Sequence, residues 1–354
     1  MESKPATIRE IAKAAKNKVT IKDVAKAAGV SPSTVFRVLN SGASVSPNTR
    51  AKVIAAQQIL QNKKAITPAK ESSRFSVGII MPAHSAADLA GHPSLFTIIT
   101  SFVEALSSRS VSNTTIIFDE KTMSPQSLIA SPKDGYLIIG TSEEQERTLV
   151  PLLSEAGLPS LLINRQAKDL HTSSVNVDDT AATMDATEHL ISLGHQNIAF
   201  IGGNKNFQNT KHRLLGYQIA MERHNLPLEN DHILFGEFSE FSGYQQGKTI
   251  LNMLHRPTAA ICASDPLAIG CMRALTEGGL RLPDDFAVIG FGNIEASKYV
   301  TPSLSTVSQP SQEMGAIAAA TLIQMLENPI ILSQKVRLKT NLVLRDSSGS
   351  PIGS

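Results

Sequence analysis

The chain has 354 residues, of which 42% are apolar and 18% are charged, and its net charge at pH 7 is +2. This length and apolar content suffice for two or three domains with buried cores. The sequence has neither an N-terminal basic-then-apolar leader nor an apolar run of membrane-spanning length, so we expect a cytoplasmic protein and no secretion or membrane insertion.

The charges are divided unevenly along the chain. Residues 1–74 hold 14 Lys and Arg against 4 Asp and Glu, which leaves 19 against 27 for the remaining residues. The first part therefore carries +10 and the second −8. Such segregation indicates a nucleic-acid-binding module attached to a neutral or acidic partner domain.

A partial repeat opens the chain. Residues 7–16, TIREIAKAAK, follow the pattern of residues 20–29, TIKDVAKAAG, but lack the turn and the cap that come after the second copy. We expect residues 1–18 to form an N-terminal extension, either a basic arm or an extra helical turn.

The stretch 20–40, TIKDVAKAAGVSPSTVFRVLN, has the pattern of two short helices joined by a tight turn. Thr20 supplies a cap for the first helix, and Gly29 ends it. Ser31 followed by Pro32 is a cap plus a first-turn proline, which predicts the start of a second helix. This pattern is typical of a helix-turn-helix unit, although spacing alone leaves an ordinary helical hairpin equally open.

A third helix is predicted from a second cap-plus-proline pair, Ser46 and Pro47. It would complete a small DNA-binding domain over residues 19–60. The polar stretch 61–74, which contains Pro68, has the composition of a linker.

From Ser76 onward, short apolar runs alternate with helical stretches. The runs are SVGIIM, TTIIF, GYLIIG, SLLIN, IAFIGG, HILF, AAICA and AVIGF. This alternation predicts parallel sheets with helices on both faces. About 270 residues are more than one hydrophobic core usually holds, so we expect two doubly wound α/β lobes. A ligand cleft is expected between them. Cys262 and Cys271 lack metal or redox spacing, so we place both in the core.

Several segments, in this order and spacing, resemble the lactose-repressor (LacI/GalR) family of bacterial transcription regulators from residue 20 to about residue 345. Besides the stretch 20–40, they include INR at 163–165, ATEHLISLGHQNIAFIGG at 186–203 and RPTAAICASDPLAIG at 256–270. The resemblance implies an N-terminal helix-turn-helix domain, two Rossmann-like lobes of the periplasmic-binding-protein type I, and a homodimer that binds a near-palindromic double-stranded DNA operator.

The resemblance also implies how the core is divided. The lobes would be about 75–190 plus 308–328 and about 191–307 plus 329–345, followed by a tail at 346–354. That tail has no leucine heptad, which favours a dimer over a tetramer. The expected effector is a sugar-like or nucleoside-like metabolite, and no cofactor, metal or membrane partner is expected. A nucleophile elbow, a phosphate loop and a carboxylate pair in a credible setting are all missing from the sequence, so we do not expect an enzyme.

By motif position, the resemblance assigns a DNA-contacting set in which Pro32, Ser33 and Arg37 would face bases and most others would face phosphates. Arg37 also suits base contact on physical grounds, because its donor fork matches O6 and N7 of guanine. The predicted DNA-binding residues are Thr20, Ser31, Pro32, Ser33, Thr34, Phe36, Arg37, Asn40, Ser46 and Thr49.

The effector set is assigned in the same way, with Arg213 as a ligand-clamping arginine and Phe238 as an aromatic platform. For Asp265, a helix cap and a ligand contact are equally open. His195 is expected to be structural. The predicted effector-binding residues are Asn164, Arg165, Arg213, Phe238, Ser264, Asp265 and Gln309.

The sequence departs from the family pattern at four places. Phe36 replaces a small hydroxyl residue on the DNA-facing side, and the stretch 63–71 lacks the leucine of the family's hinge helix and contains Pro68. Gly292-Asn293 stands where the family often places an acid, and the stretch 119–134 is short for a crossover helix. The first two departures leave a second hypothesis open, a small-molecule-binding protein with a weakened or vestigial DNA head. The other two suggest a changed or weakened effector.

Overall fold

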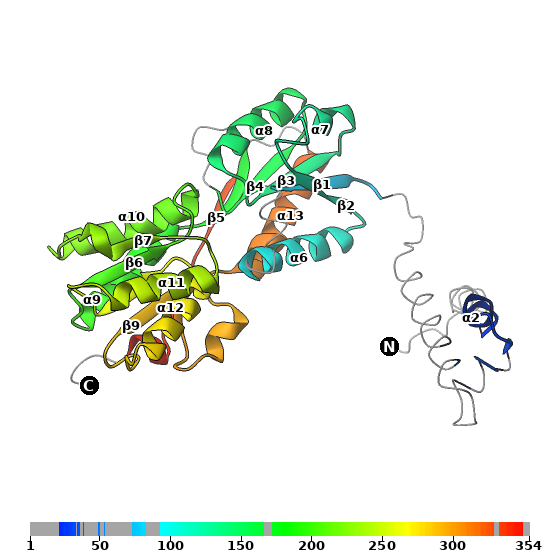
Figure 1. Cartoon of the computed structure of the whole chain (residues 1–354). Helices are drawn as coiled ribbons and strands as arrows, with labels where there is room; N and C mark the ends of the chain where they lie inside the picture. The colour runs from blue at the N-terminus through cyan, green and yellow to red at the C-terminus, as the bar shows by residue number, and fades with distance from the viewer. Residues whose placement is uncertain are drawn as a thin grey trace, which may run out of the picture. The chain divides into compact units, whose positions relative to one another are not determined.

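The chain divides into two compact units, Met1–Ser72 and Ser73–Ser354. The computed structural model shown in Figure 1 describes residues 21–32, 34, 35, 38, 49, 53, 73–82, 93–165, 172–328 and 333–349. Several predictions fall outside these described residues. They concern Thr20, Ser33, Phe36, Arg37, Asn40, Ser46, the repeat at 7–16 and the stretch 63–71.

The first unit contains the predicted turn between two helices. Helix α2, Ile21–Ala28, ends at Gly29, whose φ of +65° lies in the left-handed region that favours glycine. Beyond the turn, the backbone N–H of Thr34 donates to Oγ of Ser31 over 3.2 Å, so Ser31 caps the next helix. Pro32 is helical, as are the described residues that follow it as far as 38.

A small apolar core holds this unit together. Val24 and Ala25 from α2 are buried with Val35 and Val53, which come from later in the chain. Thr49 and Val53 are helical, in the segment where the third helix was predicted. The first helix therefore shares one apolar core with the segments that follow the turn, as a helix-turn-helix unit should.

The second unit contains two six-stranded sheets. The first has the order β11-β5-β4-β3-β1-β2, and its paired strands are all parallel. Helices α7 and α8 cover one face and α6 and α13 the other (Figure 1). The strands are β1 Ser76–Pro82, β2 Ser112–Phe118, β3 Gly135–Ile139, β4 Ser160–Ile163, β5 Ser173–Val177 and β11 Lys335–Leu338, and the helices are α6 Pro93–Ser107, α7 Ser127–Ala130, α8 Glu143–Glu155 and α13 Ser311–Glu327.

The second sheet repeats this design with the order β12-β10-β9-β8-β6-β7, in which only the β10–β12 pair is antiparallel. Helices α9 and α10 pack together, as do α11 and α12. The strands are β6 Ile198–Gly202, β7 Ile233–Phe235, β8 Ala259–Cys262, β9 Ala287–Gly292, β10 Ser305–Ser308 and β12 Asn341–Val343. The helices are α9 Asp179–Ser192, α10 Gln208–Arg223, α11 Glu240–Leu251 and α12 Asp265–Glu277, with 3-10 turns at η2 Asn230–His232, η3 Glu295–Lys298 and η4 Asp346–Ser348.

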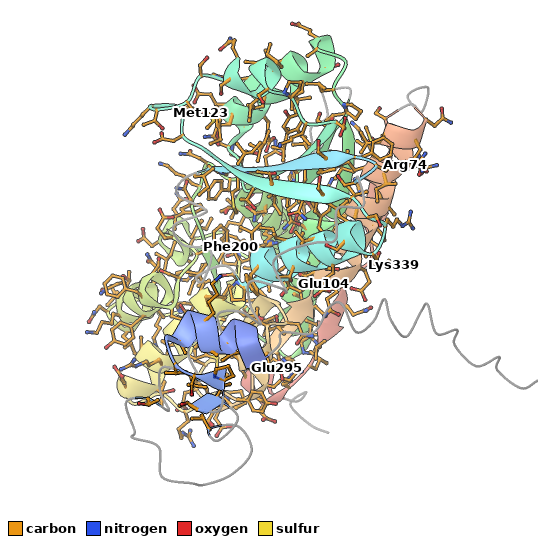
Figure 2. The ribbon with its side chains drawn as sticks, turned by 90° about the vertical axis from the view of Figure 1, so that its right-hand side faces the viewer. Arg74, Glu104, Met123, Phe200, Glu295 and Lys339 are labelled. Atoms are coloured by element: carbon orange, nitrogen blue, oxygen red, sulfur yellow. The ribbon has the colours of Figure 1, made fainter. Side chains whose placement is uncertain are left out.

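The prediction of two doubly wound α/β lobes is confirmed, and all eight apolar runs contain strands. In each sheet the chain adds its second strand on one side of the first strand, β1 or β6, and its third strand on the other side. Such switch points in strand order are where open α/β sheets bind ligands. Figure 2 shows Phe200 of β6 in the interior, whereas Glu104, Glu295 and Lys339 are exposed at the surface. Cys262 and Cys271 are fully buried, as expected. No helix in the described ranges is long and apolar enough to cross a membrane.

The lobe boundaries differ from the expected ones in three places. Strand β11 pairs with β5 in the first sheet, although the sequence placed it in the second lobe. Helix α9 belongs to the second lobe, because it packs on α10 so closely that a Cβ on Gly216 would lie 2.2 Å from the carbonyl oxygen of Thr180. The start of the expected tail is also packed, since Oγ of Ser347 donates to the carbonyl of Val288 over 2.6 Å.

Candidate functional site

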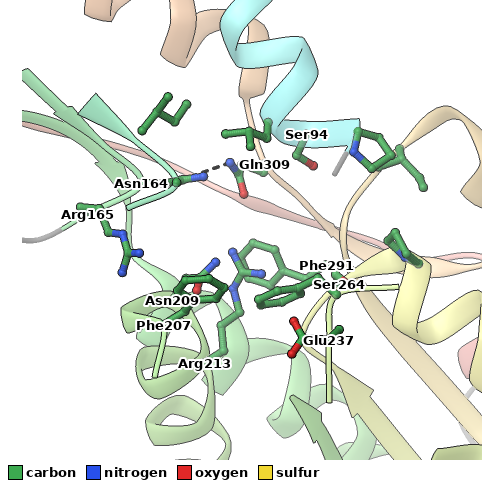
Figure 3. A pocket seen from close by; sticks show the side chains of 17 residues that line it. Ser94, Asn164, Arg165, Phe207, Asn209, Arg213, Glu237, Ser264, Phe291 and Gln309 are labelled. Carbon is green, nitrogen blue, oxygen red and sulfur yellow. Dashed lines mark hydrogen bonds between the residues drawn. The ribbon is translucent and has the colours of Figure 1, made fainter. Parts of the chain in front are cut away.

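A cleft with a cavity volume of about 210 Å³ lies between the two lobes (Figure 3). Seventeen residues line it, and most of them follow the carboxyl ends of strands in one sheet or the other. Six of the seven predicted effector residues are among them, and the exception is Asp265. The six are Asn164, Arg165, Arg213, Phe238, Ser264 and Gln309.

Arg213 extends from α10 into the cleft and is held on three sides. Its Nε lies 2.7 Å from Oδ1 of Asp179, and its Nη1 donates to the carbonyl of Ala263. The guanidinium carbon sits 3.5 Å from the ring centroid of Phe291. Only 4% of Arg213 is exposed, so its donor fork is fixed before any ligand arrives.

A second arginine enters the cleft from the end of β4. Nε of Arg165 lies 3.0 Å from Oε1 of Glu146, and both side chains are almost fully buried. The same oxygen accepts a 3.0 Å hydrogen bond from the hydroxyl of Thr141. Burial raises the pKa of the Glu146 carboxyl and lowers the pKa of Arg165, and the attraction between the two charges opposes both shifts.

Three phenyl rings contribute to the apolar surface of the cleft. Phe207 and Phe238 stack with their centroids 6.3 Å apart and their planes inclined by 22°. Phe291 lies against Arg213. The predicted aromatic platform at Phe238 therefore lies in the cleft with a second ring beside it, and the sequence reasoning did not identify that ring.

Polar side chains complete the lining. Nε2 of Gln309 donates to Oδ1 of Asn164 over 3.3 Å, and Asn164 has a positive φ of 59° where the chain leaves β4. Asn209 and the exposed carboxylate of Glu237 also line the cleft, and Glu237 accepts a long 3.5 Å contact from Asn204. These groups offer both donors and acceptors to a ligand.

Asp265 does not line the cleft, and it is not the helix cap. Ser264 caps α12 by accepting the N–H of Leu267. Asp265 is fully buried, and its carboxylate accepts the hydroxyl of Thr306 over 2.5 Å and the N–H of Ile294 over 2.8 Å. Burial raises the pKa of Asp265 to about 6, although both hydrogen bonds oppose the rise.

Two other expectations concern the second lobe. Asn293, at the place where the family often has an acid, accepts a 2.6 Å hydrogen bond from Arg345 and donates to Ser308, and it is not among the lining residues. Nδ1 of His195 lies 2.9 Å from the hydroxyl of Thr258, which gives this histidine the structural partner that the sequence did not reveal.

Eleven lining residues were missed by the sequence reasoning. Most of them lie just after a strand or at a helix start, so the rule that ligands bind at the carboxyl ends of parallel strands could have identified part of the set. They are Pro93, Ser94, Leu95, Ile139, Gly140, Phe207, Asn209, Glu237, Pro266, Phe291 and Ile294.

Four of the predicted DNA-contacting residues are described in the first unit. Ser31 and Pro32 are exposed at the start of the second helix, and Thr34 and Thr49 are partly buried. Ser31 and Thr34 also share a 2.8 Å hydrogen bond between their hydroxyls.

Known proteins match the chain over both units. Residues 20–61 match the model of bacterial regulatory proteins of the lacI family, and residues 187–348 match the periplasmic binding protein-like domain. The probable HTH-type transcriptional repressor ExuR of Bacillus subtilis (strain 168) is 30% identical over 332 residues, which cover 93% of this chain and 98% of that protein.

Solved structures agree with this match. The transcriptional regulator CelR in complex with cellobiose has a TM-score of 0.71 at 26% identity and covers 93% of this chain and 100% of its own. The lac repressor dimer bound to operator and the anti-inducer ONPF has a TM-score of 0.67 at 29% identity, with 94% and 99% covered. With a helix-turn-helix head, two periplasmic-binding-protein-like lobes and repressors as its relatives, the chain belongs to the LacI family of bacterial transcriptional regulators.

Proposed function

We propose that this chain is a DNA-binding repressor whose affinity for a near-palindromic operator is set by a sugar-like effector bound between its two lobes. The cleft carries the proposal. It combines fixed guanidinium donors, amide groups and phenyl rings at the carboxyl ends of two parallel sheets, and this is the composition of a small-molecule site.

The lining suits a ring that has polar edges and flat apolar faces. A sugar can place its C–H face on Phe207 or Phe238 while its hydroxyls bond to Arg213, Asn209 and Glu237. The cellobiose complex of CelR supports a sugar as the first class to test. A nucleoside offers a similar combination of a flat face and polar edges, so it forms the second class.

Contacts across the cleft offer a route from effector to DNA. Lys211 of α10 lies 3.8 Å from Glu143 of α8, and the guanidinium of Arg165 lies 5.4 Å from the Phe207 ring, so both contacts join the two lobes. A ligand that prefers one lobe orientation would shift the population of dimers whose heads can bind the operator.

A homodimer is part of this proposal, because a near-palindromic operator needs two heads. Each lobe exposes large apolar side chains that a partner could cover. Among the described residues these include Phe96 and Ile117 in the first lobe, 54% and 53% exposed, and Phe241 and Tyr299 in the second, 72% and 76% exposed.

A thermal-shift panel of sugars and nucleosides tests the effector part. We expect at least one compound to raise the melting temperature in a saturable way, as any ligand that binds only the folded state must. The Arg213→Ala variant should lose this rise. A panel without a single stabilising compound would contradict the proposed effector class.

Selection from random duplexes, followed by fluorescence titration against salt, tests the DNA part. A repressor should select a near-palindromic site, and its affinity should fall steeply with salt because its basic head displaces counterions. Arg37→Ala should relax the base preference. Weak binding that is equal on every duplex would favour the alternative of a vestigial head.

A further inference from the structure

The cleft contains one buried donor without an acceptor. Nη1 of Arg165 is buried and has no hydrogen-bond partner among the described residues, although Nε of the same side chain is paired with Glu146. Only 5% of the Arg165 side chain is exposed, so bulk water does not reach it freely. A buried donor of this kind is costly unless something accepts from it, and Arg165 lines the cleft, where a ligand would lie.

The position of this donor is fixed. Glu146 holds one edge of the guanidinium, and the ring of Phe207 lies 5.4 Å from its central carbon. Glu146 is itself held by the hydroxyl of Thr141. Figure 3 shows the Arg165 side chain reaching from the end of β4 toward Phe207 and Asn209. An acceptor atom of a bound ligand would therefore meet a preformed N–H rather than a mobile side chain.

The charges around the cleft restrict the kind of acceptor. Glu146 lies against Arg165 and Asp179 lies against Arg213, so each arginine of the lining has a buried carboxylate paired with it. The carboxylate of Glu237 adds a negative charge to the lining. An anionic ligand would lose its hydration, gain little from neutralised cations and be repelled by Glu237. A hydroxyl or ring oxygen can accept from Arg165 without that loss.

We propose that Arg165 forms a subsite for an uncharged oxygen of the effector, and that Glu146 is a positioning residue that fixes this guanidinium and cancels its charge. The inference rests on the proposed effector cleft and deepens it, because it predicts that the cleft selects a neutral polyhydroxylated ligand over its carboxylate- or phosphate-bearing analogues.

Sulfate binding tests the charge of the subsite without any knowledge of the effector. The melting temperature of the full chain is followed as sodium sulfate replaces sodium chloride at constant ionic strength. The wild type should show no saturable rise, whereas Glu146→Gln, which leaves Arg165 uncompensated, should show one. The rise should disappear when Arg165→Met is added. Glu144→Gln, an exposed change in the same first turn of α8, serves as the matched control and should behave like the wild type.

Matched sugars test the consequence for the ligand. D-glucose is compared with D-glucuronate and D-glucose 6-phosphate, and D-ribose with D-ribose 5-phosphate, by calorimetry on the wild type and Glu146→Gln. In each pair that binds, we expect the neutral sugar to bind the wild type at least tenfold more tightly than its charged analogue. In Glu146→Gln, the ratio of the two dissociation constants should be at least tenfold smaller than in the wild type.

Saturable sulfate binding by the wild type that Arg165→Met removes, or a charged sugar that binds the wild type as tightly as its neutral partner, would overturn the inference. The second result comes from wild-type protein alone and the first needs only Arg165→Met beside it, so both decide the matter even if Glu146→Gln does not fold. Failure of every sugar and nucleoside to bind would instead contradict the proposed effector class, while the sulfate series still reports the charge of the subsite.

Discussion

Arg213 is both a candidate ligand contact and one half of a buried ion pair. Its removal would leave the carboxylate of Asp179 buried without its partner, which typically costs about 3–5 kcal/mol. We therefore expect Arg213→Ala to lower the free energy of unfolding by an amount in that range, measured by urea denaturation.

Arg223 provides the matched control on the same helix. It pairs with Glu188 over 3.4 Å, but its side chain is 58% exposed, so Arg223→Ala should cost less than about 1 kcal/mol. An equal loss in the free energy of unfolding for the two variants would show that the buried Arg213–Asp179 pair stabilises the fold no more than the exposed Arg223–Glu188 pair does.

Asp265 should give the protein a characteristic dependence on pH. Its pKa in the folded protein is about 6, above the ordinary value of 3.8, so the folded state holds the proton more tightly than the unfolded state. Its contribution to stability is therefore complete below about pH 4 and is lost as the pH rises to about 6.

The Asp265→Asn variant removes this titration. The free energy of unfolding of the wild type, measured relative to the variant, should fall by on the order of 3 kcal/mol between pH 4 and pH 7. Urea titrations at unit pH steps provide the measurement. A constant difference across this range would mean that Asp265 does not titrate as its burial implies.

At the level of elements, α11 and α12 cross at closely packed glycines. A Cβ on Gly270 would lie 1.9 Å from the carbonyl oxygen of Glu240, and one on Gly243 would lie 2.0 Å from the carbonyl oxygen of Leu267. Both obstacles are backbone atoms, which cannot turn aside as a side chain can, so the helices would have to separate.

We expect Gly270→Ala to destabilise the protein by at least about 1–3 kcal/mol, the usual cost of overpacking, despite the better helix propensity of alanine. Arg273→Ala on the exposed side of α12 is the control, and it should change the stability by less than about 1 kcal/mol. Thermal and urea unfolding measure both. A more stable Gly270→Ala variant would contradict the close crossing.

The predictability of an element depended on its composition. The eight strands read from the sequence have runs of apolar residues that need burial on both faces. Strand β5, SSVNV, is fully buried and strand β10, STVS, is almost fully buried, but both are polar, and hydroxyls of both strands are hydrogen-bonded within the fold. The Ser305 hydroxyl, for example, lies 2.7 Å from that of Ser348, 43 residues away. Such partners cannot be identified from local pattern.

For the whole molecule, the alternation of strands and helices predicted two lobes, and the family resemblance predicted that the chain passes between them three times. The three crossings are present, but the first and the last lie at other positions than expected. The chain passes between the lobes after β5, after β10 and between β11 and β12. The strand β11, KVRL, and the strand β12, NLV, are short and half-exposed, so their patterns do not show which sheet each one joins.

Cleft residues were predicted where they lie in segments that resemble the family, and several that lie in other loops were not predicted. Motif resemblance located Arg213 and Asn164, whose segments were recognised, but Glu237 and Phe207 lie in loops after β7 and β6. Their place in the cleft depends on two lobes that meet, and that is a property of the whole fold rather than of any one segment.

If the cleft controls DNA binding, a ligand bound there must change the affinity of the protein for its operator. Operator affinity of the full chain is measured by fluorescence anisotropy on the selected duplex, at fixed salt, with and without a saturating amount of the panel compound that stabilises the protein most. We predict a change of at least tenfold, about 1.4 kcal/mol, for the wild type and no change for Arg213→Ala. If the wild type binds the operator with the same affinity whether the cleft is empty or saturated, the cleft does not control DNA binding.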